Sequence, residues 1–369
     1  MSGVDAAALA AAVLWIYLLV GRGFFWCTRE ARLASRTAPP RRIAIVIPAR
    51  NEALLIGKAV ASLAAQDYGG PFDLFVVDDH STDRTAEAAS GAHVVAAGPL
   101  PEGWTGKLWA VSEGVRAAAA FEADYFLLTD ADIVHAPVSL SRLVAHAEAG
   151  GYDLASLMVE LRCETLAERA LIPAFVFFFL KLYPPRWIAN TKRRTAGAAG
   201  GCMLVRRDTL ERIGGIATIR AELIDDCALA KAVKRGGGRV WLGLTSQARS
   251  IRQYASFAEV GRMISRTAFT QLGYSPLLLA GTVLGMSAIY LLPPVLALGF
   301  RSWLAALAWL MMMAAYAPVL RLYRRSLVWA PALPLVALFY TAATVASAIE
   351  YWRGRGGAWK GRMQAGRRS

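Results

Sequence analysis

Three long apolar runs in the last quarter of the chain constrain its fold more than any other feature. They cover residues 276–300, 303–320 and 327–349, and a shorter run covers residues 6–20. A helix needs about 20 apolar residues to cross a hydrocarbon core of about 30 Å. We therefore expect an integral membrane protein with transmembrane helices at residues 276–350 and a transmembrane anchor at residues 1–27.

Composition and charge agree with a membrane setting. Hydrophobic residues make up 56% of the chain and charged residues 18%, while Lys and Arg exceed Asp and Glu by 41 to 27. Many of the cations flank the apolar runs, where they would meet lipid headgroups. No nucleic-acid reader motif accompanies them, so nucleic acid is not an expected partner.

The basic residues also predict an orientation. Five arginines between Arg29 and Arg42 follow the first apolar run. By the positive-inside rule they place the central domain in the cytoplasm, as expected of a multi-pass protein of the cell inner membrane. A cleaved signal peptide is the alternative, which Asp5 and the lack of a basic start disfavour.

The number of crossings conflicts with the basic tail at residues 351–369. Three crossings after a cytoplasmic domain would put this tail outside, against the positive-inside rule. Either one of the three segments is re-entrant, with the Pro331/Pro334 segment as the candidate, or a spacer hides a further turn.

Residues 28–275 are predicted to form an α/β domain. Short β-branched runs alternate with Ala-rich helical patterns, which favours βαβ units and a parallel-rich sheet. Strands are expected at residues 43–47, 74–77, 93–96, 125–129 and, more weakly, 240–242, with helices at 52–66 and 108–121. The Phe-rich stretch at residues 166–182 fits a buried core helix or an interfacial helix that faces the membrane.

Polar groups follow two of the predicted strands. The first strand continues into Pro48-Ala-Arg50-Asn-Glu52, and the second into Asp78-Asp79. Helix caps and turns would explain part of each motif. Open α/β sheets bind ligands beyond the carboxyl ends of their strands, where Asp78 could accept hydrogen bonds from a ligand.

Asp130 and Asp132 follow the strand at residues 125–129, one residue apart. An ordinary turn is the plain interpretation of such a pair. In this position the pair also suits Mg²⁺ or Mn²⁺, which bind one or two carboxylates and complete their shell with phosphates and water.

Further along, three short motifs carry possible site residues. Gly200 and Gly201 lie in a predicted small-residue strand at residues 197–204, where a ligand can approach the backbone closely. Asp225 and Asp226 open a helix, where they compensate its dipole, and their mutual repulsion would raise the pKa of one enough for a general base. Arg252 comes first among three basic side chains, and Arg262 and Arg266 lie four residues apart on a predicted helix; they suit a solvated face or phosphate ligands. Four scattered cysteines indicate neither a zinc site nor a disulfide framework.

The order of these motifs resembles family 2 glycosyltransferases with the GT-A fold, a Rossmann-like nucleotide-sugar-binding domain. The resemblance rests on Pro48–Glu52, Asp78-Asp79 with Ser81 and Asp83, Gly103-Trp104-Thr-Gly-Lys107, Asp130-Ala-Asp132, Gly200-Gly201 and Asp225-Asp226 with Leu229.

The resemblance implies a role for each motif. Asp78 or Asp79 would contact the nucleoside, Asp130 and Asp132 would hold a divalent metal and the donor diphosphate, and Asp226 would be the catalytic base. Pro48, Arg50, Glu52, Trp104, Lys107, Gly200 and Gly201, with Arg262 and Arg266, are expected around the donor, and Asp225 beside the base. The expected outcome is inversion at the anomeric carbon.

Processive polysaccharide synthases of this family carry a Gln-x-x-Arg-Trp motif after the catalytic acid. Here Thr267 follows Arg266, which favours a single transfer to a lipid. Together with the stretch from Arg266 to Ser275, the membrane arrangement resembles the hopanoid-biosynthesis-associated glycosyltransferases. The alternatives are a processive synthase and a non-catalytic membrane scaffold that binds a nucleotide sugar.

Overall fold

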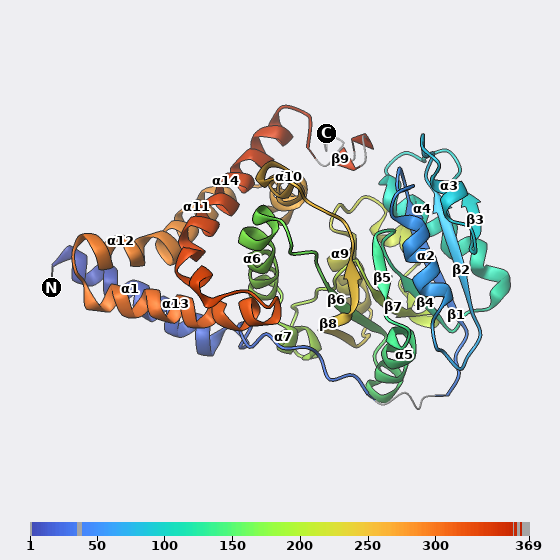
Figure 1. The fold of residues 1–369 in the computed structure, drawn as a ribbon, viewed down its shortest axis with the longest axis horizontal. Helices are drawn as coiled ribbons and strands as arrows, with labels where there is room; N and C mark the ends of the chain where they lie inside the picture. Colours follow the sequence, from blue (N-terminus) through green and yellow to red (C-terminus); the bar gives the residue numbers. More distant parts are fainter. Residues whose placement is uncertain (1, 35–38, 357, 360–361, 364–369) are drawn as a thin grey trace.

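The computed structural model describes residues 2–34, 39–356, 358–359 and 362–363. An α/β domain is joined to a group of long apolar helices contributed by both ends of the chain (Figure 1). Eight strands form one sheet in the order β3-β2-β1-β4-β7-β6-β8-β5. The strands are β1 (Ile43–Ala49), β2 (Phe72–Asp78), β3 (His93–Ala96), β4 (Tyr125–Leu128), β5 (Ile133–His135), β6 (Leu154–Glu160), β7 (Met203–Arg206) and β8 (Val240–Ser250).

The sheet is parallel in its first half and mixed in its second. Strand β1 pairs in parallel with β2 and β4, and β2 with β3. Strand β7 lies antiparallel between β4 and β6, and β8 pairs in parallel with β6 and antiparallel with β5. The parallel half aligns the carboxyl ends of β1, β2 and β4, so the polar motifs that follow them meet at one edge.

Helices cover both faces of the sheet, which explains why β1 is apolar throughout. Every residue of β1 is buried. Ile43, Ile45 and Ile47 pack in one cluster with α2 and α5, and Ala44 and Val46 pack in another with α4 and α9. The helices of this domain are α2 (Ile56–Ala64), α3 (Thr85–Ala88), α4 (Gly106–Ala117), α5 (Ser139–Gly150), α6 (Leu166–Leu182), α7 (Pro185–Ala189), α8 (Arg207–Arg212), α9 (Asp225–Arg235) and α10 (Phe257–Ala268), with 3₁₀ turns η2 (Ala118–Phe121), η3 (Ile216–Ile219) and η4 (Thr270–Leu272).

Four helical segments within the described residues are long and apolar enough to cross a membrane: Gly3–Gly21, Pro276–Gly299, Trp303–Leu322 and Leu327–Trp352. Their elements are α1 (Gly3–Ile16) with the π-helix η1 (Tyr17–Gly21), α11 (Pro276–Met286), the π-helix η5 (Ser287–Leu291), α12 (Leu292–Gly299), α13 (Trp303–Leu322), the 3₁₀ helix η6 (Leu327–Ala332) and α14 (Leu333–Trp352). The tail holds the short strands β9 (Ala358–Trp359) and β10 (Arg362–Met363), and its remaining cations, Lys360, Arg367 and Arg368, lie outside the described residues.

Helix α6 joins the two parts of the molecule (Figure 1). It is largely buried, and Phe177 on α6 packs against Phe25 and Tyr316, with ring centroids 5.3 and 5.4 Å away. Tyr340 on α14 donates a hydrogen bond of 2.9 Å to the Leu171 carbonyl of α6. One continuous hydrophobic cluster therefore runs from the sheet through α6 to the apolar helices.

The predicted α/β fold with flanking apolar helices is confirmed, with three differences in its strands. Strand β8 extends to Ser250, eight residues beyond the weak prediction at 240–242, and β5 and β6 were not predicted. The small-residue stretch that begins at Gly197 forms β7 only from Met203. These strands lack a long β-branched run, and their pairing depends on neighbours that are distant in the sequence.

Candidate active site

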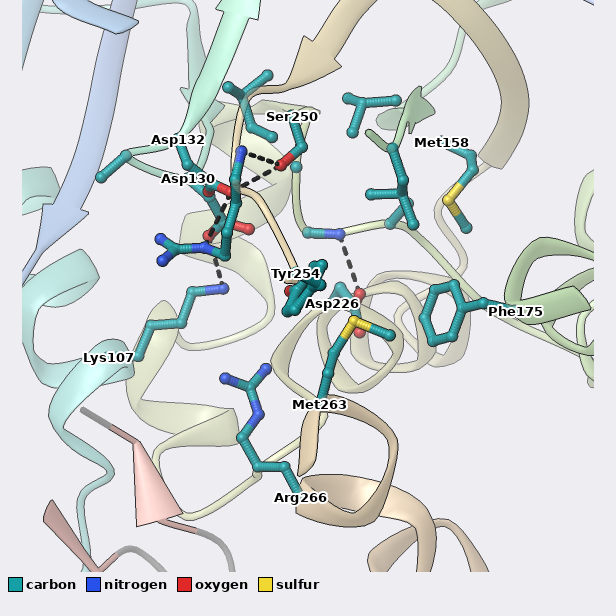
Figure 2. Close-up of a pocket in the computed structure, with 18 of the residues that line it drawn as sticks. Lys107, Asp130, Asp132, Met158, Phe175, Asp226, Ser250, Tyr254, Met263 and Arg266 are labelled. Atoms are coloured by element: carbon teal, nitrogen blue, oxygen red, sulfur yellow. Dashed lines mark hydrogen bonds and ion pairs between the residues drawn. The ribbon is translucent and has the colours of Figure 1, made fainter. Parts of the chain in front are cut away.

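A cavity of about 540 Å³ opens between the carboxyl end of the sheet and helices α6 and α10. Figure 2 shows acidic and basic side chains converging on it from several elements. It brings together eleven of the residues that the sequence indicated: Pro48, Glu52, Lys107, Asp130, Asp132, Gly200, Gly201, Asp226, Arg252, Arg262 and Arg266.

Lys107 is the central cation of this site. It lies in the first turn of α4, which begins after Thr105 caps the helix. Its Nζ lies 2.9 Å from Oδ1 of Asp130 and 2.9 Å from Oδ2 of Asp225. Burial opposes the charged form, but attraction by these two carboxylates outweighs it and raises the pKa of Lys107 above its usual range. Lys107 therefore stays protonated between the two acids.

Asp226 faces the cavity from the first turn of α9. Its Oδ2 accepts a hydrogen bond of 2.9 Å from the amide of Gly200, and its Oδ1 accepts one of 2.6 Å from the amide of Cys227. Burial, and then the neighbouring charge of Asp225, raise the pKa of Asp226 to about 6. This places the carboxylate where it can exchange a proton near neutral pH.

Asp132 is held by the end of strand β8. Its Oδ2 accepts a hydrogen bond of 2.7 Å from Ser250 Oγ and lies 3.2 Å from Nε of Arg252. Arg252 also reaches Glu52, with Nη2 2.5 Å from Oε1. A single guanidinium thus links the loop after β1 to the Asp130–Asp132 pair.

The lack of a side chain has a different effect at Gly200 than at Gly201. A Cβ on Gly200 would point among the charged groups, 3.5 Å from Asp226 Oδ2 and 3.5 Å from Lys107 Nζ. A Cβ on Gly201 would lie 2.9 Å from Val159 Cγ2, which is too close. Gly200 therefore keeps the cavity open, and Gly201 allows the backbone to pack on β6.

Four residues expected around the donor or the base do not line the cavity. Arg50 donates hydrogen bonds to the Asp79 and His80 carbonyls and lies 3.8 Å from the Asp79 carboxylate, which is fully buried. Trp104 packs against Trp109, with ring centroids 5.2 Å apart. Asp225 contacts Lys107 from behind the cavity.

Asp78 also lies outside the cavity lining, one strand away from it. It pairs in register with Ala49, next to Pro48. Its Oδ2 accepts a long hydrogen bond of 3.3 Å from the Ser81 amide, and its buried Oδ1 has no hydrogen-bond partner among the described residues. An unsatisfied buried acceptor of this kind is uncommon in native structures.

The sequence reasoning missed the apolar wall of the cavity and part of its rim. Met158 on β6, Phe175 and Phe179 on α6 and Met263 on α10 form the wall, and Figure 2 shows Phe175 and Met263 beside Asp226. Ser250, Tyr254 and Glu259 form the missed part of the rim, next to Arg252, which the sequence indicated as a possible phosphate ligand. The signal for the wall was the spacing of four between Phe175 and Phe179, although other phenylalanines in the same stretch obscure it.

Asp130 and Asp132 suit a divalent cation that is completed by a ligand. No group of three or more His, Cys, Asp or Glu side chains in the described part of the chain is arranged to hold a metal ion. Mg²⁺ needs only one or two carboxylates when phosphates and water supply the remaining oxygens. Lys107 contacts Oδ1 of Asp130, whereas Oδ2 lies toward the space beside Gly200. The carboxylates present therefore fit such a metal.

Comparison with known proteins gives a consistent assignment for this domain. Residues 44–214 match the model of glycosyl transferase family 2. An N-acetylglucosaminyltransferase of Mesorhizobium japonicum is 29% identical over 184 residues, 45% of this chain and 39% of that protein. An undecaprenyl-phosphate 4-deoxy-4-formamido-L-arabinose transferase of Pectobacterium carotovorum is 31% identical over 136 residues, 34% of this chain and 39% of that protein. The chain thus spans about two fifths of the length of these curated relatives.

A solved structure extends the likeness to nearly the whole chain. The mannosyltransferase from Pyrobaculum calidifontis, determined with GDP-Man and Mn²⁺, superposes with a TM-score of 0.55 over 95% of this chain and 99% of that chain. Its sequence identity is 19%, so the likeness concerns the fold.

Proposed function

We propose that the protein, in which residues 44–214 match the model of glycosyl transferase family 2, transfers a sugar from a nucleotide-diphosphate donor to a membrane lipid, with inversion. The observation that carries this proposal is a single cavity in which Asp226 and Asp130 face an apolar wall on α6. A charged donor and an apolar acceptor would meet there.

The donor would lie along the carboxyl end of the sheet. Asp78, with its unsatisfied Oδ1, would bind the nucleoside, while Asp79 would support the site through Arg50. Lys107, Arg262 and Arg266 would contact the diphosphate, as cations do at phosphate sites. Asp130 and Asp132 would hold Mg²⁺ or Mn²⁺, which when bound neutralises charge on the leaving diphosphate.

Asp226 would act as the base. It would accept the proton of the acceptor hydroxyl as the acceptor oxygen bonds to the anomeric carbon. The bond from that carbon to the diphosphate oxygen breaks in the same displacement, and the nucleoside diphosphate leaves with the electron pair. The amides of Gly200 and Cys227 would hold the carboxylate in position.

A lipid acceptor is favoured by the apolar wall and by the neighbouring membrane helices. Phe175 and Phe179 line the cavity on α6, which packs against α13 and α14. The Pectobacterium relative is by name an undecaprenyl-phosphate sugar transferase, which supports a lipid acceptor. A hopanoid is the specific acceptor that the sequence resemblance suggests. We propose that the central domain lies on the cytoplasmic face of the inner membrane, as the five arginines between Arg29 and Arg42 indicate.

Membranes that contain the protein, incubated with a panel of labelled nucleotide sugars and Mg²⁺ or Mn²⁺, test this function. We expect one donor to give a lipid-soluble product of one added sugar, whereas a processive synthase would give polymer. Asp226→Asn should abolish transfer while donor binding is retained, and the exposed Asp208→Asn is the matched control. Donor binding without transfer by the unmodified protein would favour the scaffold, and turnover by Asp226→Asn would refute the role of the base.

A further inference from the structure

Three of the four apolar segments run between the end of the molecule that is farthest from the sheet and the side that faces the α/β domain, called the domain side below. Ala8, Leu296 and Ala305 pack together, which joins the start of α1, the end of α12 and the start of α13 at the end farthest from the sheet (Figure 1). Near the sheet, Arg22 Nε donates a 3.0 Å hydrogen bond to the Lys181 carbonyl, and the Leu161 amide donates one of 3.3 Å to Tyr323 Oη. Helices α1 and α13 therefore both end on the domain side.

The fourth segment has a different course. It begins with η6, which packs against α13. In the sequence, η6 starts at Leu327, soon after Tyr323. Four residues separate α13 from η6, and the first of them, Tyr323, accepts the hydrogen bond of the Leu161 amide, which follows β6. The start of this segment is therefore close to the domain side, where α13 ends.

The far end of the same segment also returns to the domain side. The amide of Phe269, just after α10, donates a 3.1 Å hydrogen bond to Ser347 Oγ. Tyr351 stacks on Tyr274, with ring centroids 4.3 Å apart, and Tyr274 lies just before α11 begins. Phe339 packs near Phe257, so α14 runs parallel to α10, which lines the cavity with Arg262 and Arg266.

We propose that residues 327–352 enter and leave the membrane on the same side, embedded in the leaflet next to the catalytic domain. The partner of its outer face is the lipid of that leaflet. Leu335 is 71% exposed and Val328 is 83% exposed, and Leu338 and Trp352 are also exposed on this segment. Exposed apolar side chains of this size beside crossing helices suit acyl chains.

The flanking charges fit this arrangement. Arg321, Arg324 and Arg325 precede the segment, and Arg353 and Arg355 follow it. With three crossings all five lie on the domain side, and the connection at the other side carries only Arg301 among the described residues of that turn. The positive-inside rule is then satisfied by every short loop, which four crossings would not allow.

Cysteine labelling of the full chain tests the arrangement. In a Cys27→Ser background the remaining native cysteines are buried. Single variants Arg84→Cys in the domain, Arg301→Cys, Arg324→Cys and Arg355→Cys are treated with a membrane-impermeant maleimide in intact cells and in opened cells. We expect Arg84→Cys, Arg324→Cys and Arg355→Cys to share one pattern and Arg301→Cys to show the opposite one. Labelling of Arg355→Cys together with Arg301→Cys would overturn the proposal.

A reporter on the unmodified chain supplies a second measurement. Green fluorescent protein or alkaline phosphatase is fused after Ser369, and the same pair is inserted at Arg84 as the domain-side reference. If the segment is re-entrant, the green fluorescent protein fusions are fluorescent and the alkaline phosphatase fusions are inactive at both positions. An active phosphatase only at Ser369 would show that α14 crosses the membrane. Neither readout depends on the sugar, the acceptor or the proposed activity.

Discussion

Nε of Arg252 lies 3.2 Å from Oδ2 of Asp132. The same guanidinium contacts Glu52, which the sequence places 200 residues away, so one ion-pair network fixes the position of the end of β8 relative to the loop after β1. The side chains of both acids are largely buried, whereas that of Arg252 is 27% exposed.

Replacing Arg252 should destabilise the protein. Arg252→Met leaves two largely buried carboxylates without this counter-charge, for which we expect a loss of about 1–3 kcal/mol, less than for a fully buried pair. Thermal unfolding in detergent measures the change, and the exposed Arg249→Met on the same strand is the control. Equal melting temperatures for the two variants would mean that the network adds nothing to stability.

Asp226→Asn should stabilise the fold at neutral pH while it removes the proposed base. The pKa of Asp226 is raised to about 6 in the folded protein, against about 4 in an unfolded chain. The folded state therefore binds the proton more tightly, and its stability falls as the pH rises from about 4 to 6. Because Asn resembles the protonated acid, we expect a gain of about 1–3 kcal/mol at pH 7.5.

The pH dependence of that gain provides its control. At pH 4, where the native acid carries its proton in the fold, the melting temperatures of Asp226→Asn and the unmodified protein should converge. A constant difference across this range would show that the substitution acts through packing and not through charge.

The adjacent glycines should respond differently to alanine. At Gly200 the new Cβ meets only ordinary contacts, so Gly200→Ala should fold but weaken donor binding by about tenfold, or about 1.4 kcal/mol. At Gly201 the Cβ would be 2.9 Å from Val159, so Gly201→Ala should lower the melting temperature instead. Melting curves and donor titrations of both variants separate the effects, and the reverse pattern would contradict this assignment.

Lys107 should be needed for donor binding. Lys107→Met removes the charge that neutralises Asp130 and Asp225 and would face the donor diphosphate. We expect donor affinity to fall about 10- to 100-fold, in line with about 1.5–3 kcal/mol for a hydrogen bond to a charged group. Equilibrium binding of the labelled donor measures it, with exposed Lys192→Met as the control. Unaltered affinity would remove Lys107 from the donor site.

Much of the charged half of the site could be predicted from the sequence because each of its acids follows an apolar strand or opens a helix. Asp130 and Asp226 are examples, and parallel pairing brings such strand ends together. Arg252 could not be placed in the same way. It follows the distal half of β8, where no apolar run marks a strand, and its partners Glu52 and Asp132 are distant in sequence.

The apolar half of the site could not be predicted from local sequence patterns either. Phenylalanines occupy positions 175 and 177–179 of α6, so they surround much of the helix. Helical periodicity therefore identifies no single buried face. In the structure Phe177 packs against Tyr316 of α13, whereas Phe175 and Phe179 line the cavity.

The hydrophobic cluster that continues through α6 affects how this protein can be handled. A fragment cut at residue 275 to remove the last three apolar segments would uncover Phe177, Phe178 and the carbonyl side of Leu171, which Tyr316, Tyr290 and Tyr340 now cover. Aromatic rings exposed in this way promote aggregation. Truncation is therefore a poor route to a water-soluble form of this protein, and extraction of all 369 residues in detergent is the better starting point for purification.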